Sequence, residues 1–403
     1  MTAALPQINP HLVDTGTPPI PEAQAWLAGY DGRHGPPINL SQAVPGSPPP
    51  PELLERLGAA AASADAAKYG PIHGDMALVA AYAAHVGEIY GADIGAPEIA
   101  ITAGCNEAFF VTALAVANAG EAVLLPAPWY FNHAMTLRML GIKALPLQCR
   151  AEHRFVPDPE EARQVLRDHR RASPDIPVRA IVLVTPNNPT GAVIPPGILA
   201  KFAALALETN TWLVLDETYR DFLPAAEPRP HGLFATPEHR QRLIQLYSFS
   251  KAYCMPGHRA GAMIAPAAAM AEVTKVLDCI QICAPRAAQA ALAWAIPALA
   301  AWRRATADQV NRRAELFRAG LMDAPDWQLQ SMGAYFAYLA HPYQGRDASC
   351  VARTLASGHG ILALPGSYFG PGQAASLRFA FANVSDDVAS GVGARLCGAL
   401  PPR

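Results

Sequence analysis

Short apolar runs alternate with helical stretches along the middle of this chain, and this alternation constrains the fold more than any other feature. Seven runs have the character of buried strands, at residues 99–102, 122–125, 144–147, 180–184, 212–215, 243–247 and 260–264. Helical stretches separate most of them, at about 106–119, 133–140, 159–170, 197–209 and 267–279. The order predicts an α/β fold with a large, mostly parallel sheet covered by helices.

The pattern differs on both sides of this region. Residues 1–50 are rich in proline, which predicts an extended arm and no long helix. Residues 51–284 then form the predicted large domain. Beyond them an alanine-rich helical region reaches Met322, and strand candidates follow at 335–339, 361–363 and 377–382. We expect residues 285–403 to form a smaller α+β domain, to which the arm contributes.

Composition narrows the classes of function. The chain has 403 residues, 51% of them hydrophobic, and a formal net charge of -2 without any basic run, which disfavours nucleic acid and anionic membranes as partners. Its seven cysteines include no C-x-x-C pair, which favours a reducing cytoplasm and no metal site. No basic and apolar leader and no apolar span of about 18 residues is present, so we expect a cytoplasmic metabolic protein.

Ligand sites of open parallel sheets lie beyond the carboxyl ends of the strands. The first run leads into Gly104, Cys105 and Asn106, a turn that feeds a helix whose free N–H groups suit a phosphate. The second run ends near Trp129 and Tyr130, either of which could stack on a planar ring or pack in the core. The turn at Gly104 is a weak signal alone, because any strand-to-helix turn can carry a glycine.

Two further strand ends carry polar side chains. The run at 180–184 leads to Asn187 and Asn188, held between prolines and suited to directed hydrogen bonds. The run at 212–215 delivers Asp216 to the sheet edge, where a desolvated carboxylate needs a cationic partner. Capping of the next helix is the competing interpretation for Asp216.

A single lysine, Lys251, stands between small hydroxyl residues just after the run at 243–247, and Arg259 follows across a Pro-Gly turn. Partial burial would keep its amine neutral and nucleophilic near neutral pH, as covalent chemistry with carbonyl groups requires. Arg259 could anchor a phosphate. An exposed surface lysine is the plain alternative.

Together these strand ends resemble those of the class I/II aminotransferases, which are fold-type I enzymes that depend on pyridoxal 5′-phosphate (PLP). The similarity extends from about residue 38 to 382, and three segments carry it: Asn187-Asn188-Pro189-Thr190-Gly191, Asp216-Glu217-Thr218-Tyr219, and Ser248-Phe249-Ser250-Lys251 with Gly257 and Arg259. The resemblance implies a large domain with a seven-stranded sheet and a ping-pong transfer of an amino group to a 2-oxo acid.

The resemblance also implies roles for individual residues. Lys251 would bond to the cofactor and move a proton, Asp216 would hold the pyridine nitrogen protonated, and Asn188 and Tyr219 would bind the ring's 3-oxygen. Further expected contacts to the ring and phosphate come from Gly104, Cys105, Asn106, Tyr130, Ser248 and Arg259.

Two more segments complete the expected site. Tyr69 lies in a Tyr-x-x-x-x-Gly loop like that through which a second subunit reaches the phosphate, which implies a homodimer with shared sites. Arg378 matches the arginine that clamps the substrate carboxylate, with Asn188 beside it. Ala43 and His133 depart from the residues frequent in relatives, and we expect them to shape the substrate pocket without touching the cofactor chemistry.

Three functions are compatible with these residues. The first is an aminotransferase, and since we find no second basic clamp, its amino donor is expected to be neutral or aromatic. The second is a PLP-dependent lyase, decarboxylase or oxidase with the same cofactor site. The third is a non-catalytic, PLP-binding regulator domain, which the absence of a DNA-binding motif and basic patch disfavours.

Overall fold

The computed structural model describes residues 6–223, 229–397 and 399. Its largest sheet has seven strands in the order β2-β8-β7-β6-β5-β3-β4. The strands are β2 (Ile99–Thr102), β3 (Ala122–Ala127), β4 (Lys143–Gln148), β5 (Val178–Val184), β6 (Trp212–Asp216), β7 (Leu243–Ser248) and β8 (Gly261–Ile264). Only β8 runs antiparallel to its neighbours. The mostly parallel seven-stranded sheet expected from the apolar runs is confirmed.

Both faces of this sheet are buried. Along β5, Ile181 and Leu183 point into one core and Ala180 and Val182 into the other, as the two-residue period of a strand dictates. The first core contains α3 (Pro51–Ala61), α4 (Met76–Tyr90), α7 (Pro159–Ala172), α8 (Pro196–Thr209) and α12 (Arg286–Ala298). The second contains α5 (Cys105–Val116), α6 (Phe131–Met139) and α11 (Ala267–Ile280).

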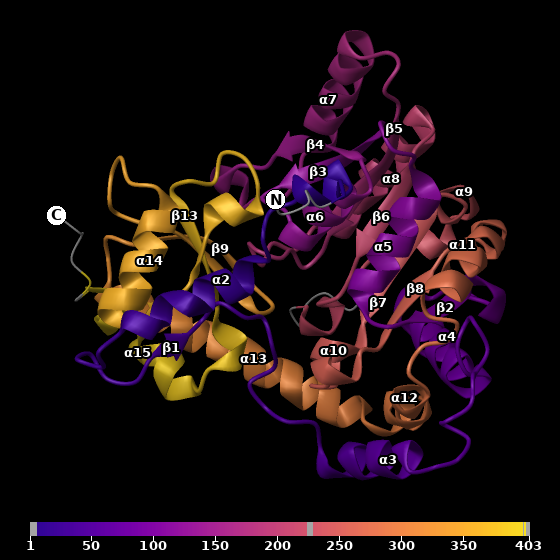
Figure 1. Ribbon diagram of the computed structural model, residues 1–403, viewed down its shortest axis with the longest axis horizontal. Helices are drawn as coiled ribbons and strands as arrows, with labels where there is room; N and C mark the ends of the chain where they lie inside the picture. Colours follow the sequence, from indigo (N-terminus) through magenta and orange to yellow (C-terminus); the bar gives the residue numbers. More distant parts are fainter. Residues whose placement is uncertain (1–5, 224–228, 398, 400–403) are drawn as a thin grey trace.

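A second, antiparallel sheet stands beside the first (Figure 1). Its order is β12-β13-β10-β9, with β9 (Gln328–Gly333), β10 (Phe336–Ala340), β12 (Leu364–Pro365) and β13 (Ser376–Ala380). Helices α13 (Ala300–Gly320), α14 (Ala348–His359) and α15 (Asp386–Cys397) pack around it. The sequence did not predict β9, because its residues show no apolar alternation.

The N-terminal arm joins this second unit. Its strand β1 (Ile38–Asn39) pairs in parallel with β11 (Ile361–Leu362). As the prolines predict, its helices are short: α1 (Pro10–Val13) and α2 (Pro19–Ala25). Two other short helices, α9 (Pro237–Arg240) and α10 (Phe249–Ala252), flank β7.

The position of the domain boundary depends on α12 and α13. Helix α12 contributes Leu292 and Ile296 to the core beside the large sheet, whereas α13 contributes Val310 and Phe317 to the core of the second sheet. Figure 1 shows α13 running from α12 towards the second sheet. The boundary after residue 284 stays a prediction, and this packing favours a later one, within α13.

Candidate active site

A cavity of about 500 Å³ opens at the carboxyl ends of the parallel strands. It lies where the large sheet, the arm and β13 meet, as expected for an α/β protein. Most of the predicted residues line it: Ala43, Cys105, Asn106, Tyr130, Asn188, Asp216, Tyr219, Ser248, Lys251, Arg259 and Arg378. The fold therefore gathers side chains that lie more than 300 residues apart in the sequence.

Lys251 is held in the cavity by α10, the short helix that begins directly after β7. Its Nζ atom donates a hydrogen bond of 2.6 Å to the carbonyl oxygen of Ala43. Burial, reinforced by the positive charges of Arg259 and Arg378, lowers the pKa of Lys251 to about 8 from its ordinary value of 10.5. A substantial fraction of this amine is therefore neutral at a pH slightly above 7.

Asp216 ends β6 with its carboxylate buried. Its Oδ1 accepts the backbone N–H of Thr218 at 3.0 Å, and its Oδ2 lies 3.1 Å from Nε2 of His133. Burial alone would raise the pKa of Asp216, but the hydrogen bonds from His133 and Thr218 outweigh it and lower the pKa below its ordinary value. The carboxylate thus stays ionised although it is desolvated.

His133 is a residue whose position the sequence analysis misjudged. It was expected to shape the substrate pocket, but its ring is buried against Phe109, with ring centroids 3.9 Å apart, and it contacts Asp216 instead. The spacing could have revealed this, because α6 begins at the mouth of β3, and β3 lies two strands from β6. His133 supports the acid that faces the cavity.

Asp216 is followed by a firmly anchored segment. The Arg220 guanidinium lies over the Tyr247 ring, 3.9 Å from its centroid, and donates to Tyr90 Oη at 3.1 Å. The neighbouring Asp221 accepts a hydrogen bond of 2.7 Å from Tyr247 Oη. Tyr219, which lies between these anchored residues and Asp216, is buried and lines the cavity.

The start of α5 forms an anion site with Arg259. Gly104, the N-cap residue, has φ of 93°, and a Cβ atom there would lie 2.1 Å from Arg259 Nη2. Only glycine therefore lets the guanidinium approach this turn, where it donates to the Ala103 carbonyl oxygen at 3.2 Å. The backbone N–H groups of Cys105 and Asn106 have no acceptor among the described residues, as is usual at a helix start.

One further hydroxyl and one aromatic ring flank this anion site. Ser248 caps α10, and its Oγ accepts the N–H of Ser250 at 3.3 Å. Tyr130, at the start of α6, lines the cavity, whereas Trp129 lies against Gly370. The geometry thus favours Tyr130 over Trp129 as the aromatic residue that faces a bound ring.

Arg378 is a fully buried cation. It donates to Asn188 Oδ1 at 2.9 Å and to the carbonyl oxygen of Ser41. Burial lowers its pKa to about 10, which still leaves the guanidinium charged at neutral pH. No acidic side chain within the described part of the chain forms an ion pair with it. A buried guanidinium without a carboxylate partner suits an anionic ligand.

Residues of the N-terminal arm form one wall of the cavity, which the sequence did not predict. Pro18, Pro19 and Ile20, at the start of α2, line the cavity together with Val44 and Phe131. These side chains are apolar. A proline pair in an extended arm gives no signal for contact with a distant site, so only the fold could reveal it.

Tyr69, which was expected to serve a second subunit, does not line the cavity of its own chain. Its side chain is 79% exposed on the loop between α3 and α4.

The described residues contain no group of side chains arranged to hold a metal ion. They also contain no helix with the length and apolarity needed to cross a bilayer.

The donor set fits PLP. The cavity combines an amine of lowered pKa, an ionised buried carboxylate and an anion site of backbone N–H groups with a guanidinium. These suit the aldehyde, the pyridine nitrogen and the phosphate of that cofactor. A second guanidinium, Arg378, lies in the same cavity and is not needed for these three groups.

Comparisons with known proteins agree with this geometry. The sequence profile of the family described as aminotransferase class I and II matches residues 36–392. A valine–pyruvate aminotransferase of Mycobacterium tuberculosis is 28% identical over 93% of this chain and 94% of its own length. An aromatic aminotransferase of Arabidopsis thaliana is 26% identical over 89% of both chains. A solved Thermus thermophilus aspartate aminotransferase has a TM-score of 0.87 and 23% identity, over 98% of this chain and all of its own.

The fold and the cavity define a fold-type I PLP-dependent enzyme. More particularly, this chain belongs to the class I and II aminotransferase family, and it is a PLP-dependent aminotransferase. The family membership selects the first of the three functions that the sequence left open.

Proposed function

We propose that this enzyme transfers the amino group of an L-amino acid with an apolar or aromatic side chain to a 2-oxo acid by a ping-pong mechanism. The observation that carries the proposal is the charge distribution of the cavity. Its only basic lining residues within the described chain are Lys251, Arg259 and Arg378, which the cofactor and the substrate α-carboxylate would occupy. No cation then remains for a side-chain carboxylate, and the wall from Pro18 to Ile20 is apolar.

The names of two relatives support this substrate class. One is a valine–pyruvate aminotransferase and another an aromatic aminotransferase. Both names describe amino acids whose side chains carry no charge. An apolar side chain gains about 25 cal/mol for each Å² of surface that the wall removes from water.

The substrate is bound by Arg378 and Asn188 in this proposal. The guanidinium takes the α-carboxylate in a bidentate pair. Because Asn188 Oδ1 accepts from Arg378, its amide N–H groups are free to donate to the 3-oxygen of the cofactor ring. Tyr219, buried beside the cavity, would donate to the same oxygen.

Lys251 performs the proton transfer. When bound, PLP supplies an electron sink that makes the substrate Cα–H acidic. The neutral Lys251 amine would take the proton from Cα and deliver one to the C4′ atom of the cofactor, and a pKa of about 8 suits both directions. Asp216, kept ionised by His133 and Thr218, would retain the proton on the pyridine nitrogen. The second half-reaction reverses these transfers with a 2-oxo acid.

The phosphate would be held by the backbone N–H groups of Cys105 and Asn106 beside Gly104, by Ser248 and by Arg259. Tyr130 would cover the face of the ring. Ala43, whose carbonyl oxygen accepts from Lys251, would lie next to the substrate.

We also propose that the enzyme is a homodimer in which Tyr69 of each subunit completes the site of the other. The support is that Tyr69 is 79% exposed and lies outside the cavity of its own chain. Met76 at the start of α4, Ile280 at the end of α11 and Ile282 just after it are exposed as well. Such apolar side chains suit an interface with a second copy.

The cytoplasmic location expected from the cysteines stays a prediction.

A panel of amino acids tests the substrate class. The holoenzyme is incubated with a single amino donor and pyruvate, and the new 2-oxo acid is measured. We expect valine, leucine, methionine or phenylalanine to exceed aspartate and glutamate by at least about tenfold in kcat/KM, because an unpaired carboxylate in an apolar pocket is costly. If only aspartate and glutamate serve as donors, the proposed substrate class is wrong.

A further inference from the structure

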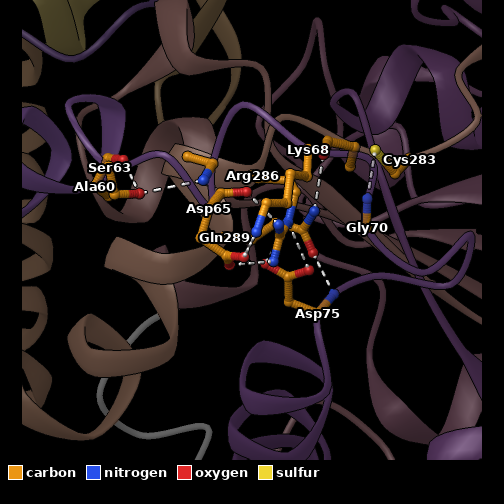
Figure 2. A network of polar contacts seen from close by, with 11 residues as sticks. Ala60, Ser63, Asp65, Lys68, Gly70, Asp75, Cys283, Arg286 and Gln289 are labelled. Carbon is orange, nitrogen blue, oxygen red and sulfur yellow. Dashed lines mark hydrogen bonds and ion pairs between the residues drawn. The ribbon is translucent and has the colours of Figure 1, made fainter.

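The loop that carries Tyr69 is fastened to the start of α12 on both of its flanks (Figure 2). On one side, Arg286 Nη2 lies 3.0 Å from Asp65 Oδ2, and Nη1 of the same guanidinium donates to the Asp65 carbonyl oxygen at 2.5 Å. On the other side, Arg286 Nε donates to Asp75 Oδ1 at 3.2 Å. A single guanidinium thus ties together two points that are ten residues apart.

Two more residues near the start of α12 hold the same loop. Cys283 Sγ accepts the backbone N–H of Gly70 at 3.3 Å, directly beside Tyr69. The Gln289 side chain is fully buried, and its Oε1 accepts the backbone N–H of Asp75 at 2.6 Å. Its amide nitrogen donates to the carbonyl oxygen of Ala284 at 2.8 Å, which fixes the orientation of the amide.

The packing around Gly70 shows how closely the loop and the guanidinium fit. A Cβ atom at Gly70 would lie 2.8 Å from Asp75 Oδ1 and 2.9 Å from Arg286 Nε. At the next bend, a Cβ at Gly74 would lie 2.4 Å from Ile101 Cγ1 on β2. The loop therefore packs directly against Arg286 and β2 at these two glycines, although the Tyr69 side chain itself is 79% exposed.

An exposed aromatic side chain on a loop ordinarily samples many positions, and a ligand must pay the entropy of ordering it. A fixed backbone removes much of that cost before binding. The Arg286 and Asp75 side chains are only 17% and 18% exposed, so their ion pair is less screened than a surface pair, whereas Asp65 is 70% exposed and its pair is more strongly screened.

We propose that Arg286, with Asp65 and Asp75, is a positioning clamp that presets Tyr69 for the cofactor phosphate bound in the partner subunit. The proposal rests on the shared-site homodimer proposed above. Arg286 contacts the backbone and carboxylates of the loop and does not line the cavity of its own chain, so in this proposal it acts through the loop and is a positioning residue.

The test compares two ligands that differ only in the phosphate. Affinities of the apo-dimer for PLP and for pyridoxal are measured by fluorescence titration for the wild type, Arg286→Met, Tyr69→Phe and the double variant. Arg171→Met, which removes an exposed arginine 3.9 Å from Asp168 on α7, is the matched control. Sedimentation of each variant reports whether the dimer persists.

We expect Arg286→Met to weaken PLP binding about three- to tenfold, the cost of ordering one or two side chains, and to leave pyridoxal binding unchanged. In the Tyr69→Phe background, Arg286→Met should have almost no further effect, because both substitutions remove the same contact. Arg171→Met should match the wild type. Asp65→Asn, which removes only one ion pair, should give a smaller loss of the same kind.

The outcomes separate the two proposals. If Tyr69→Phe weakens PLP binding but neither Arg286→Met nor Asp65→Asn does, the clamp is wrong and the shared site stands. If Tyr69→Phe has no effect, the proposed role of Tyr69 fails first. If Arg286→Met weakens PLP and pyridoxal binding equally, its role is general stability and the clamp is overturned. Should that variant not fold, Asp65→Asn decides by the same comparison.

Discussion

Nε2 of His133 lies 3.1 Å from Oδ2 of Asp216, and both side chains are buried between α5, α6 and β6. The contact helps to keep a desolvated carboxylate ionised, which is the state that a protonated pyridine nitrogen requires. An acid that took up the proton itself could not hold that nitrogen in its charged form.

Replacing His133 should therefore slow the reaction without affecting substrate binding. His133→Phe keeps the packing on Phe109 but removes the hydrogen bond to Asp216. A hydrogen bond to a charged group contributes about 1.5–3 kcal/mol, so we expect kcat to fall roughly ten- to hundredfold with little change in KM. Steady-state kinetics measure this, and His133→Asn, which keeps a donor, should recover part of the loss. Equal kcat in the wild type and His133→Phe would contradict the role.

The pKa of Lys251 predicts a pH profile for covalent capture of pyridoxal by the apoenzyme. The neutral amine is the reactive form, so the rate should rise with pH and level off above about 8. An ordinary lysine would level off only near 10.5. Stopped-flow absorbance gives the profile. A rate that still rises steeply above pH 9 would show that burial does not shift this amine.

The same shift predicts a dependence of stability on pH. The unfolded chain binds the Lys251 proton up to about 10.5, whereas the folded apoenzyme releases it near 8. The unfolded state thus binds more protons between these values, so this group makes the folded state more stable as pH rises through that window. Urea unfolding of the apoenzyme at several pH values, with Lys251→Met as the comparison, isolates the contribution. A stability difference independent of pH would contradict it.

Arg378→Leu should impair binding of amino acids through their carboxylate. We expect kcat/KM for a good donor to fall about a hundredfold or more, because a buried bidentate pair is lost. The free energy of unfolding should change much less than the binding free energy that corresponds to this loss in kcat/KM. Removal of a buried cation also removes the cost of desolvating it. Kinetics and urea unfolding measure the two effects. An amine with the same side chain but no carboxylate should react equally poorly with the wild type and with Arg378→Leu. If the substitution also lowered the rate with that amine, the assignment of Arg378 to the substrate carboxylate would be contradicted.

Gly191, in the loop after β5, packs closely against Gly333 at the end of β9 in the second sheet. Its φ is 71°, and a Cβ there would lie 2.2 Å from the backbone nitrogen of Gly333. Gly191→Ala should lower the free energy of unfolding by about 2–4 kcal/mol through backbone strain and overpacking. Gly197→Ala on α8, where the added Cβ meets nothing within 4 Å, is the control and should be neutral or slightly stabilising. Equal losses in both variants would contradict the explanation.

The sequence predicted the large sheet well because its strands are short, apolar and bounded by turns. It also singled out Asp216, at the end of β6, and Lys251, shortly after β7, both of which line the cavity, while their roles stay predictions. It missed β9, whose mixed polar residues show no alternation. The role of His133 and the wall at Pro18 depend on contacts between distant segments, and local patterns do not encode them.

Absorbance of the purified enzyme with PLP tests the central claim most directly. The wild type should show a visible band that Lys251→Ala lacks or shifts. Titration with an apolar amino acid should convert this band to an ultraviolet one while one equivalent of 2-oxo acid is formed, and pyruvate should restore it. If the visible band instead regenerates with release of ammonia and without any 2-oxo acid acceptor, or responds to aspartate and glutamate alone, the proposed transamination of apolar amino acids is wrong.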